Sequence, residues 1–359
     1  MSVLGLMHGM HGMHGMHGMH GMHGMHGMGG YGNLPSGALA GLQSSTEAII
    51  HAAGVDPVPV AGLENLTRGA AANMKRWSPD IRALILQSTF LHQLGWATDD
   101  AVSFVSITWG GTPVCTVKPP ENATLALQCD LVRCYADQRA DRANEILSQL
   151  GAFSPYFAII LGLTEGRNPR TFELLDAVQT IAGLVTMMPK HLFACRRPAE
   201  FDTRILPLIA TPSHGSFPSS HATQAFAMAS VLAALVGAHP DHFGDVGKRI
   251  DLTYRQAHRI AVNRTVAGVH FPVDSWAGAR LGVQIGRILC AMMGTGGTVH
   301  GTDTYDPNTA PGTDFLFADL AAVLAPGGGP AVPVAQDPMM NWLWSQARDE
   351  FALHTSTVA

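Results

Sequence analysis

Hydrophobic residues recur at helical spacing through most of the chain. Five segments show this period: 80–94, 121–150, 170–188, 245–268 and 339–351. Three of them begin with a capping residue followed by proline at the first helical position: Ser78-Pro79, Asn168-Pro169 and Asp337-Pro338. This start is typical of an α-helix, because proline has no N–H to lose there and its backbone angle already suits the helix.

Signals for β-structure are few. Ala101 to Trp109 is the one strand-like stretch, and Gly110-Gly111 follows it. Residues 326–333 are rich in glycine and proline, which predicts a break before a final helical segment. The pattern as a whole predicts an all-α fold, with one helical domain over residues 37–359 arranged as two sub-bundles.

The N-terminus carries a different pattern. Residues 7–27 repeat Met-His-Gly seven times, a period that gives neither a helical nor a strand face. We expect residues 1–36 to form a disordered tail, with an expression tag as another possible origin of the repeat. Imidazole and thioether groups also suit copper, nickel and zinc, so a metal-sequestering role is an alternative function. The candidate ligands are His8, His11, His14, His17, His20, His23 and His26.

Charge and apolar run lengths exclude two classes of partner. The net charge is −5 and only 14% of the 359 residues are charged, with no basic stripe, so we expect no nucleic-acid partner. The apolar runs, such as Ala222 to Ala238, fall short of the ~20 uninterrupted residues of a membrane span. Residues 1–6 lack a secretion signal. The sequence therefore predicts no transmembrane span and a cytoplasmic location.

The five cysteines match no CxxC spacing. We interpret them as mostly buried thiols, although Cys129 and Cys134 could pair in an oxidising compartment.

Three short segments hold polar residues that a plain helical core does not need. In "KHLFACRRP", Lys190 and Arg197 are seven residues apart, so two helical turns would put both cations on one face. Such a pair can also be an ordinary feature of a solvated surface. In "SFPSSHATQAF", Ser219 and Ser220 precede an apolar helix, whose first backbone N–H groups and dipole favour an anion. An N-cap alone explains one serine, and a lone histidine such as His221 is commonly a core residue.

The third segment is "NRTVAGVHFPVDSWAGA". His270 and Asp274 are four residues apart, a spacing that lets the carboxylate accept from one ring nitrogen and leaves the other free to attack or to ligate. Arg264 lies shortly upstream. Together the three segments supply three cations, helix-end donors and two histidines, which is the inventory of a site for a charged tetrahedral or trigonal-bipyramidal oxyanion.

The order Lys-x6-Arg-Pro, Pro-Ser-x-His and Arg-x5-His-x3-Asp resembles the three-part signature of a known superfamily. That superfamily joins type 2 phosphatidic acid phosphatases, bacterial acid phosphatases and vanadium-dependent haloperoxidases. The pieces run from Lys190 to Asp274, about 85 residues, and we take 190–274 as the motif core. The resemblance implies a helical bundle of the acid phosphatase/vanadium haloperoxidase type, often assembled as a homo-oligomer.

The resemblance also implies roles for individual residues. His270 would be the covalent centre, attacking phosphorus in a phosphatase or binding vanadium axially in a haloperoxidase, and Asp274 would hold its tautomer. His221 would be the acid–base residue. The vanadate or phosphate oxygens would be held by Lys190, Arg197, Arg264, Ser219 and the Ser220 amide.

The choice between branches depends on residues outside the signature. His214 lies seven residues before His221, and "HATQ" begins at His221; in both features the chain is similar to algal bromoperoxidases. We therefore expect a vanadate-dependent haloperoxidase that oxidises bromide or iodide with hydrogen peroxide, with His214 and Lys190 among its catalytic residues. The alternative is a soluble acid phosphatase that hydrolyses phosphate monoesters through a phosphohistidine at His270.

Two positions depart from the signature. Ser220 stands where the superfamily usually has glycine, so a left-handed backbone there would strain the serine. Asn263 replaces the usual serine before Arg264, at a position that is peripheral in the superfamily.

Overall fold

The computed structural model describes residues 65–294 and 296–352, and this part of the chain is mostly helical. The prediction of an all-α fold is confirmed. The longer helices are α4 (Pro79–Gln93), α5 (Asn122–Cys134), α6 (Arg139–Ser148), α7 (Ser154–Leu161), α8 (Pro169–Phe193), α10 (Ser220–Gly237), α12 (Val246–Val266), α13 (Pro272–Met293) and α15 (Pro338–Ala352). The short ones are η4 (Ala71–Arg76), η5 (Ala136–Gln138), α9 (Pro198–Phe201), α11 (Pro240–Phe243), η6 (Pro307–Thr309), η7 (Phe317–Asp319) and α14 (Ala321–Leu324).

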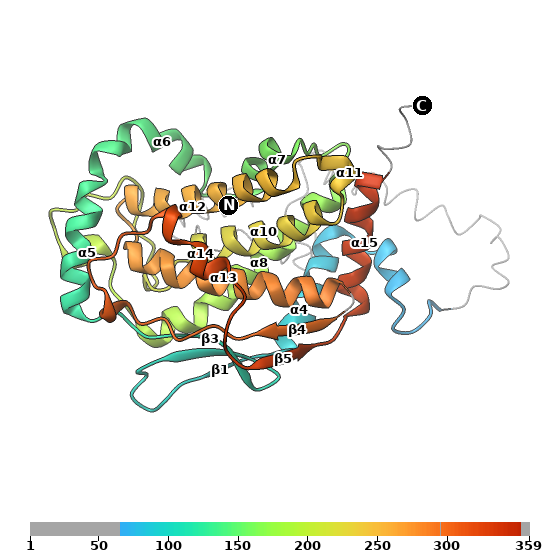
Figure 1. Cartoon of the computed structure of the whole chain (residues 1–359), viewed down its shortest axis with the longest axis horizontal. Helices are drawn as coiled ribbons and strands as arrows, with labels where there is room; N and C mark the ends of the chain where they lie inside the picture. Colours follow the sequence, from blue (N-terminus) through green and yellow to red (C-terminus); the bar gives the residue numbers. More distant parts are fainter. Residues whose placement is uncertain (1–64, 295, 353–359) are drawn as a thin grey trace, which may run out of the picture.

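Helix α10 lies at the centre of the bundle, and α8, α12 and α13 pack around it (Figure 1). Its sequence is rich in alanine and carries no charge, so no face of it requires water. Two polar side chains are accommodated inside this core, because Ser230 Oγ donates to Phe226 O at 2.8 Å and Gln224 Nε2 donates to Gln179 O at 3.2 Å. By length and composition α10 could also cross a membrane, although 83% of it is buried inside the protein.

Glycines on α13 let this helix approach α10 very closely. A Cβ on Gly278 would lie 2.5 Å from Ser219 O and 2.8 Å from Ala222 Cβ. The same holds one and two turns further on, at Gly282 and Gly286, where a Cβ would meet the next turns of α10. We call these three glycines the α13 glycine seam. It fixes the distance between the two helices because any side chain there would push them apart.

The three helix starts with proline at the first position are confirmed at α4, α8 and α15. The end of α8 differs from the sequence analysis, since the helix continues through Pro189 to Phe193. Ala194 then ends it in a left-handed conformation with φ 49°. The reasoning that two helical turns join Lys190 to Arg197 is therefore wrong, because Arg197 lies beyond the helix as the N-cap of α9.

The strand-like stretch is one strand of a small sheet. Strand β2 (Val105–Trp109) pairs antiparallel with β1 (Leu94–Ala97) and β3 (Thr112–Val117). Gly110 and Gly111, with φ of 54° and 83°, form the tight turn between β2 and β3. The partner strands escaped the sequence analysis because each is short and one of them follows directly from a helix.

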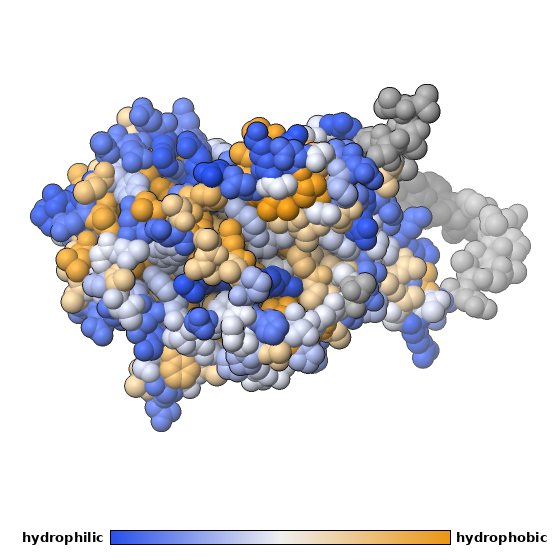
Figure 2. All heavy atoms as spheres, in the orientation of Figure 1, coloured by the Kyte–Doolittle hydropathy of each residue, from blue (hydrophilic) through white to orange (hydrophobic). Residues whose placement is uncertain are grey.

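The glycine- and proline-rich segment does not separate the last helix from the bundle. Part of it forms β5 (Ala331–Val334), which pairs antiparallel with β4 (Gly297–His300), and α15 packs against α8 and α13. One large core cluster extends from Met74 to Phe351. Figure 2 shows hydrophobic residues on this face in several groups between hydrophilic ones. All five cysteines lie in the described part and are unpaired, with Cys134 exposed.

Candidate active site

The three signature segments converge at the N-terminal ends of α10 and α13. The loop before α10 is tied to both neighbours, since Ser219 N donates to Asp274 O and Ser216 N donates to Cys195 O, each at 2.9 Å. Gly268, with φ 76°, turns the chain between α12 and α13 so that the next residues return towards Arg264. Local turns therefore bring together residues that are up to about 85 positions apart in the sequence.

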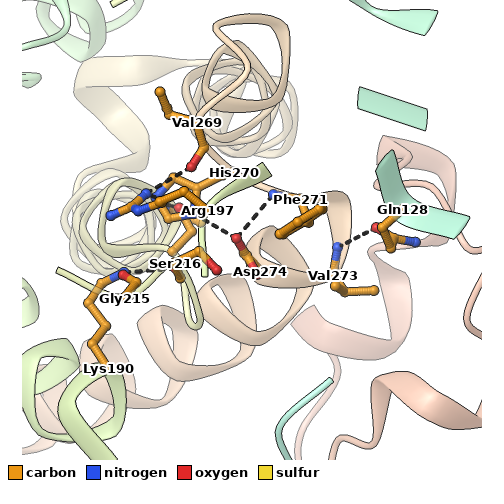
Figure 3. Close-up of polar contacts among 12 residues, drawn as sticks. Gln128, Lys190, Arg197, Gly215, Ser216, Val269, His270, Phe271, Val273 and Asp274 are labelled. Carbon is orange, nitrogen blue, oxygen red and sulfur yellow. Dashed lines mark hydrogen bonds and ion pairs between the residues drawn. The ribbon is translucent and has the colours of Figure 1, made fainter. Parts of the chain in front are cut away.

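His270 is oriented by Asp274, as its spacing predicts. Its Nδ1 donates to Asp274 Oδ2 at 2.8 Å, and Phe271 N donates to the same oxygen at 3.0 Å (Figure 3). This bond keeps the proton on Nδ1, so the lone pair of His270 lies on Nε2. Burial lowers the pKa of His270 well below its usual value, and Arg197 and Lys190 add to this effect. His270 is thus a neutral imidazole with an unprotonated Nε2, the form that a nucleophile requires.

Arg197 lies directly against that nitrogen. Its Nη1 donates to Val269 O and to His270 Nε2, both at 2.8 Å, and its Nε donates to His214 O at 3.1 Å. The guanidinium is 1% exposed, and burial lowers its pKa to about 10. A guanidinium remains charged at that pKa, so it can stabilise negative charge at His270.

Arg264 and His221 line the same cavity as Arg197 and His270. Arg264 Nη1 is 3.5 Å from His221 Nε2, and Arg264 Nε has no hydrogen-bond partner within the described residues. His221 Nε2 donates to Gln149 O at 3.2 Å, which leaves Nδ1 to carry a transferred proton. Burial lowers the pKa of His221 well below its usual value, and the charge of Arg264 lowers it further.

Lys190 and His214 complete the wall of the site. Lys190 Nζ donates to Gly215 O at 2.9 Å and to Ser216 O at 2.8 Å (Figure 3). Burial and the neighbouring Arg197 lower the pKa of Lys190. His214 Nδ1 is 3.1 Å from Arg197 Nη2, and burial, followed by Lys190 and Arg197, lowers the pKa of His214 to about 4.

The predicted site residues line two adjoining cavities, and His214 lines both. The inner one has a volume of about 20 Å³, and the predicted residues that line it are Arg197, His214, Ser220, His221, Arg264 and His270. Its remaining wall is apolar: Leu150, Ile209, Ala210, Pro212 and Val269. The outer cavity, of about 340 Å³, is lined by Lys190, His214 and residues of the 194–196 turn, among others. Asp274 lies behind His270 and is fully buried.

Neither serine is strained. Ser219 is the N-cap of α10 and its Oγ accepts from Ala222 N at 3.3 Å. Ser220 is the first residue of the helix, and its Oγ lies 2.6 Å from Thr186 Oγ1. Among the described residues other than glycine, only Val102 and Ala194 have positive φ, so the departure from glycine at Ser220 brings no backbone strain.

Two further residues contact this site, Gln149 as the C-terminal cap of α6 and Asn263 from α12. Gln149 and Asn263 are both fully buried, and Gln149 Oε1 accepts from Asn263 Nδ2 at 3.0 Å. In this chain the amide of Asn263 is part of the network that holds Arg264. No local signal marks Gln149, since its role depends on residues more than a hundred positions away.

The buried charges of the site do not balance. Lys190, Arg197 and Arg264 are each 1% exposed, whereas Asp274 is the only buried carboxylate of the described chain. Arg82, the other buried arginine of that part, is paired with Glu173 at 2.7 Å. Uncompensated buried cations are costly unless an anion joins them. The site therefore favours an anionic ligand.

Metal ligation by side chains alone finds no support in residues 65–294 and 296–352, where no group of three or more His, Cys, Asp or Glu residues could hold a metal ion. The seven tail histidines lie outside the described residues.

Comparison with known families matches residues 175–297 to the PAP2 superfamily. This range contains the whole of the motif core. The chain carries a PAP2 superfamily domain. Among curated proteins, the chain is similar to the decaprenylphosphoryl-5-phosphoribose phosphatases of two Mycobacterium tuberculosis strains, CDC 1551 / Oshkosh and ATCC 25618 / H37Rv. Each is 27% identical over 137 residues, which cover 38% of this chain and 70% of the relative.

One solved structure is similar over a longer range, the transmembrane PAP2 type phosphatidylglycerolphosphate phosphatase from Bacillus subtilis. The identity is 22% and the TM-score 0.33, over 58% of this chain and 91% of the other.

The prediction of a haloperoxidase is wrong. The curated relatives of the chain are phosphatases, which contradicts the expected peroxide and halide substrates and the oxidoreductase class. His214 and the "HATQ" residues do not distinguish a haloperoxidase from a phosphatase, because the inner cavity offers the same donors to any tetrahedral oxyanion. Vanadate and phosphate both fit such a donor set, so the cavity itself does not distinguish the two branches.

The predictions of no transmembrane span and a cytoplasmic location are also wrong. Helix α10 meets the length and composition of a span, and the curated relatives are named for a decaprenyl-linked substrate. The apolar run from Ala222 was expected to be interrupted by Gln224 and Ser230. Both side chains satisfy their hydrogen bonds within the bundle, so they do not interrupt the apolar helix.

Proposed function

We propose that this chain is a phosphatase that hydrolyses a phosphate monoester through a covalent phosphohistidine at His270. The observation that carries the proposal is the unprotonated Nε2 of His270, held by Asp274 and facing a cavity lined by two buried arginines and His221. This arrangement provides a nucleophile, charge stabilisation and an acid–base group within one space. The phosphatase relatives of the PAP2 domain support the same reaction class.

The phosphoryl group would enter between His270 and His221. Its oxygens would replace His270 Nε2 as acceptors for Arg197 Nη1, and they would also accept from the unpartnered Nε of Arg264. Burial keeps His221 neutral and the charge of Arg264 adds to this effect, and the dianion would offset that charge. The pKa of His221 would therefore rise when substrate binds, which prepares the ring to act as an acid.

In the first step His270 Nε2 forms a bond to phosphorus while the ester P–O bond breaks. His221 gives a proton to the leaving alkoxide, so the alcohol departs neutral. In the second step His221 takes a proton from water, and the resulting hydroxide attacks phosphorus and releases inorganic phosphate from His270. Asp274 stabilises the positive charge that His270 carries in the phosphohistidine.

The apolar wall of the inner cavity favours an ester of an apolar alcohol. Leu150, Ile209 and Pro212 lie beside the histidines, and Leu206, in the same loop as Ile209, is 71% exposed. The curated relatives are named for decaprenylphosphoryl-5-phosphoribose, a compound that carries both a prenyl chain and a phosphate monoester, the latter on its ribose. We therefore propose a phosphate monoester that carries a prenyl or long alkyl chain as the substrate class.

The test compares phosphate release from farnesyl monophosphate and from glucose 6-phosphate, both in detergent, with His270→Ala as the control. We expect faster release from farnesyl monophosphate, a ³¹P signal of a phosphohistidine in quenched samples, and no turnover by His270→Ala. Activity that survives in His270→Ala would contradict the covalent mechanism. Equal rates for the two esters would contradict the substrate class but not the reaction.

A further inference from the structure

Gln149 lies outside the three signature segments but contacts two residues of the proposed active site, Arg264 and His221. It follows α6 as its C-terminal cap and is fully buried. Its side-chain Oε1 accepts from Arg264 Nη2 at 2.9 Å, and its backbone O accepts from His221 Nε2 at 3.2 Å. One residue therefore fixes both a phosphate-binding arginine and the acid–base histidine.

The orientation of the Gln149 amide is fixed by its other partners. Its Nε2 donates to Glu145 Oε1 at 3.1 Å, and its Oε1 also accepts from Asn263 Nδ2. A flipped amide would set its NH₂ group against the donors of Arg264 and Asn263, and its oxygen against a carboxylate. Glu145 is itself held in place by Arg259, with Nη2 to Oε2 at 2.6 Å. The network thus extends from an exposed ion pair to the buried arginine.

The chemistry of the amide matters as much as its position. A carboxylate in contact with Arg264 would neutralise the guanidinium and compete with phosphate for its N–H groups. Gln149 instead places a neutral acceptor against Arg264 and keeps the charge of Glu145 one residue further away. Arg264 is then anchored by Gln149 and by Ile146 O, at 3.2 Å, while its Nε stays available.

We propose that Gln149 is a positioning residue of the phosphate site, an uncharged spacer that anchors Arg264 and His221 without neutralising Arg264. The inference rests on the proposed phosphatase function for its catalytic meaning, but its binding consequence is separate. Asn263, where related signatures have serine, supports the spacer because its amide bridges Glu145 and Gln149 at 2.9 and 3.0 Å.

The experiment measures inorganic phosphate binding by calorimetry for the full chain and three variants. Gln149→Met removes the acceptor at similar length, and we expect phosphate to bind about 10-fold more weakly or worse, as for loss of a hydrogen bond to a charged group. Gln284→Met is the matched control. Gln284 is equally buried, donates to Val114 O and His300 O, and accepts from Arg287, far from the cavity. It should lose stability but keep its phosphate affinity within about 2-fold.

Gln149→Glu tests the charge of the spacer. We expect phosphate to bind more weakly to Gln149→Glu than to Gln149→Met at pH 7.5, because the introduced carboxylate pairs with Arg264 and competes with phosphate for its N–H groups. A purely structural role predicts the opposite order, since glutamate keeps the length and the acceptor oxygen of glutamine while methionine does not.

Unchanged phosphate affinity in Gln149→Met, or in Gln149→Glu at pH 7.5, would overturn the proposal. Loss of folding in both variants while Gln284→Met folds would also overturn it, because Gln149 would then be structural. If the unsubstituted chain binds no phosphate, the site is not an oxyanion site and both proposals fail. If it binds phosphate but hydrolyses no monoester, only the proposed function fails, and the binding comparison still decides the role of Gln149.

Discussion

Replacing Asp274 by asparagine removes one charge from the site and leaves its shape unchanged. Asp274 Oδ2 accepts from His270 Nδ1 at 2.8 Å and from Phe271 N at 3.0 Å. An asparagine oxygen can occupy the same place and accept both bonds. The variant therefore separates the charge of the carboxylate from its positioning of the ring.

The magnitude follows from the charge that develops on His270. Phosphoryl transfer to Nε2 turns the ring into a cation, whose centre lies about 4 Å from the carboxylate, where an effective dielectric of about 20 gives about 4 kcal/mol. That energy is absent in the neutral ground state, so it lowers the barrier of the first step. At about 1.4 kcal/mol per factor of ten, Asp274→Asn should reduce kcat by about 10³-fold with little change in KM.

The assay is steady-state phosphate release from farnesyl monophosphate, together with urea unfolding to verify the fold. Asp314→Asn is the matched control, because Asp314 also accepts from a backbone N–H, that of Phe315, and from a side chain, the Tyr135 hydroxyl. Its kcat should stay within about 2-fold of the unsubstituted value. A loss of less than about 10-fold in Asp274→Asn would refute the reasoning, since the carboxylate charge would then contribute little to the transition state.

Three further outcomes are expected. Gly278→Ala should lower the free energy of unfolding by about 1–3 kcal/mol in urea titrations, because the added methyl group overpacks the α13 glycine seam. An unchanged free energy of unfolding would mean that α10 and α13 can move apart freely. Burial lowers the pKa of His221 and of His270. Below pH 6.5 the unfolded chain therefore binds more protons than the folded chain, and the free energy of unfolding should fall as the pH drops. The slope is at most about 1.4 kcal/mol per pH unit for each histidine. The pKa of Asp274, raised by burial, acts in the opposite direction, and urea unfolding at pH 7.5 and 5 measures the net sign. Deletion of the Met-His-Gly tail should leave phosphate release unchanged while it removes Cu or Ni binding measured by equilibrium dialysis, and a loss of turnover would place the tail in the catalytic mechanism.

The helical elements could be predicted because their signals are local. Proline after a capping residue marked the starts of α4, α8 and α15, and apolar periodicity marked α12. The end of α8 could not be predicted in this way. Proline normally ends such a pattern, yet here the helix continues past Pro189, because the surrounding bundle stabilises it beyond what local propensity allows. The short strands β1 and β3 likewise depend on pairing with β2, which no local sequence signal marks.

The members of the candidate site could be named from their spacing, but their arrangement could not. The spacing of four between His270 and Asp274 predicted a contact that the structure contains. Arg197 reaches the site from a loop and not from the helix face that was expected, and Gln149 depends on contacts with α10 and α12 that no sequence window contains. The choice of reaction failed for a different reason, since a cavity for tetrahedral oxyanions carries no residue that identifies the central atom.

The α13 glycine seam has a consequence for how substrate preference can change. It sets the separation of the helix ends that carry Ser219 and Asp274, and beside these ends lie the proposed nucleophile, His270, and the proposed acid–base residue, His221. The reaction geometry is therefore built into a part of the core that tolerates no added atoms. The apolar wall belongs to a separate loop around residue 209 and to the end of α6. Substitutions in that loop can adapt the protein to a different alcohol while the distance between the reacting groups stays the same, so specificity and chemistry can evolve independently in this chain.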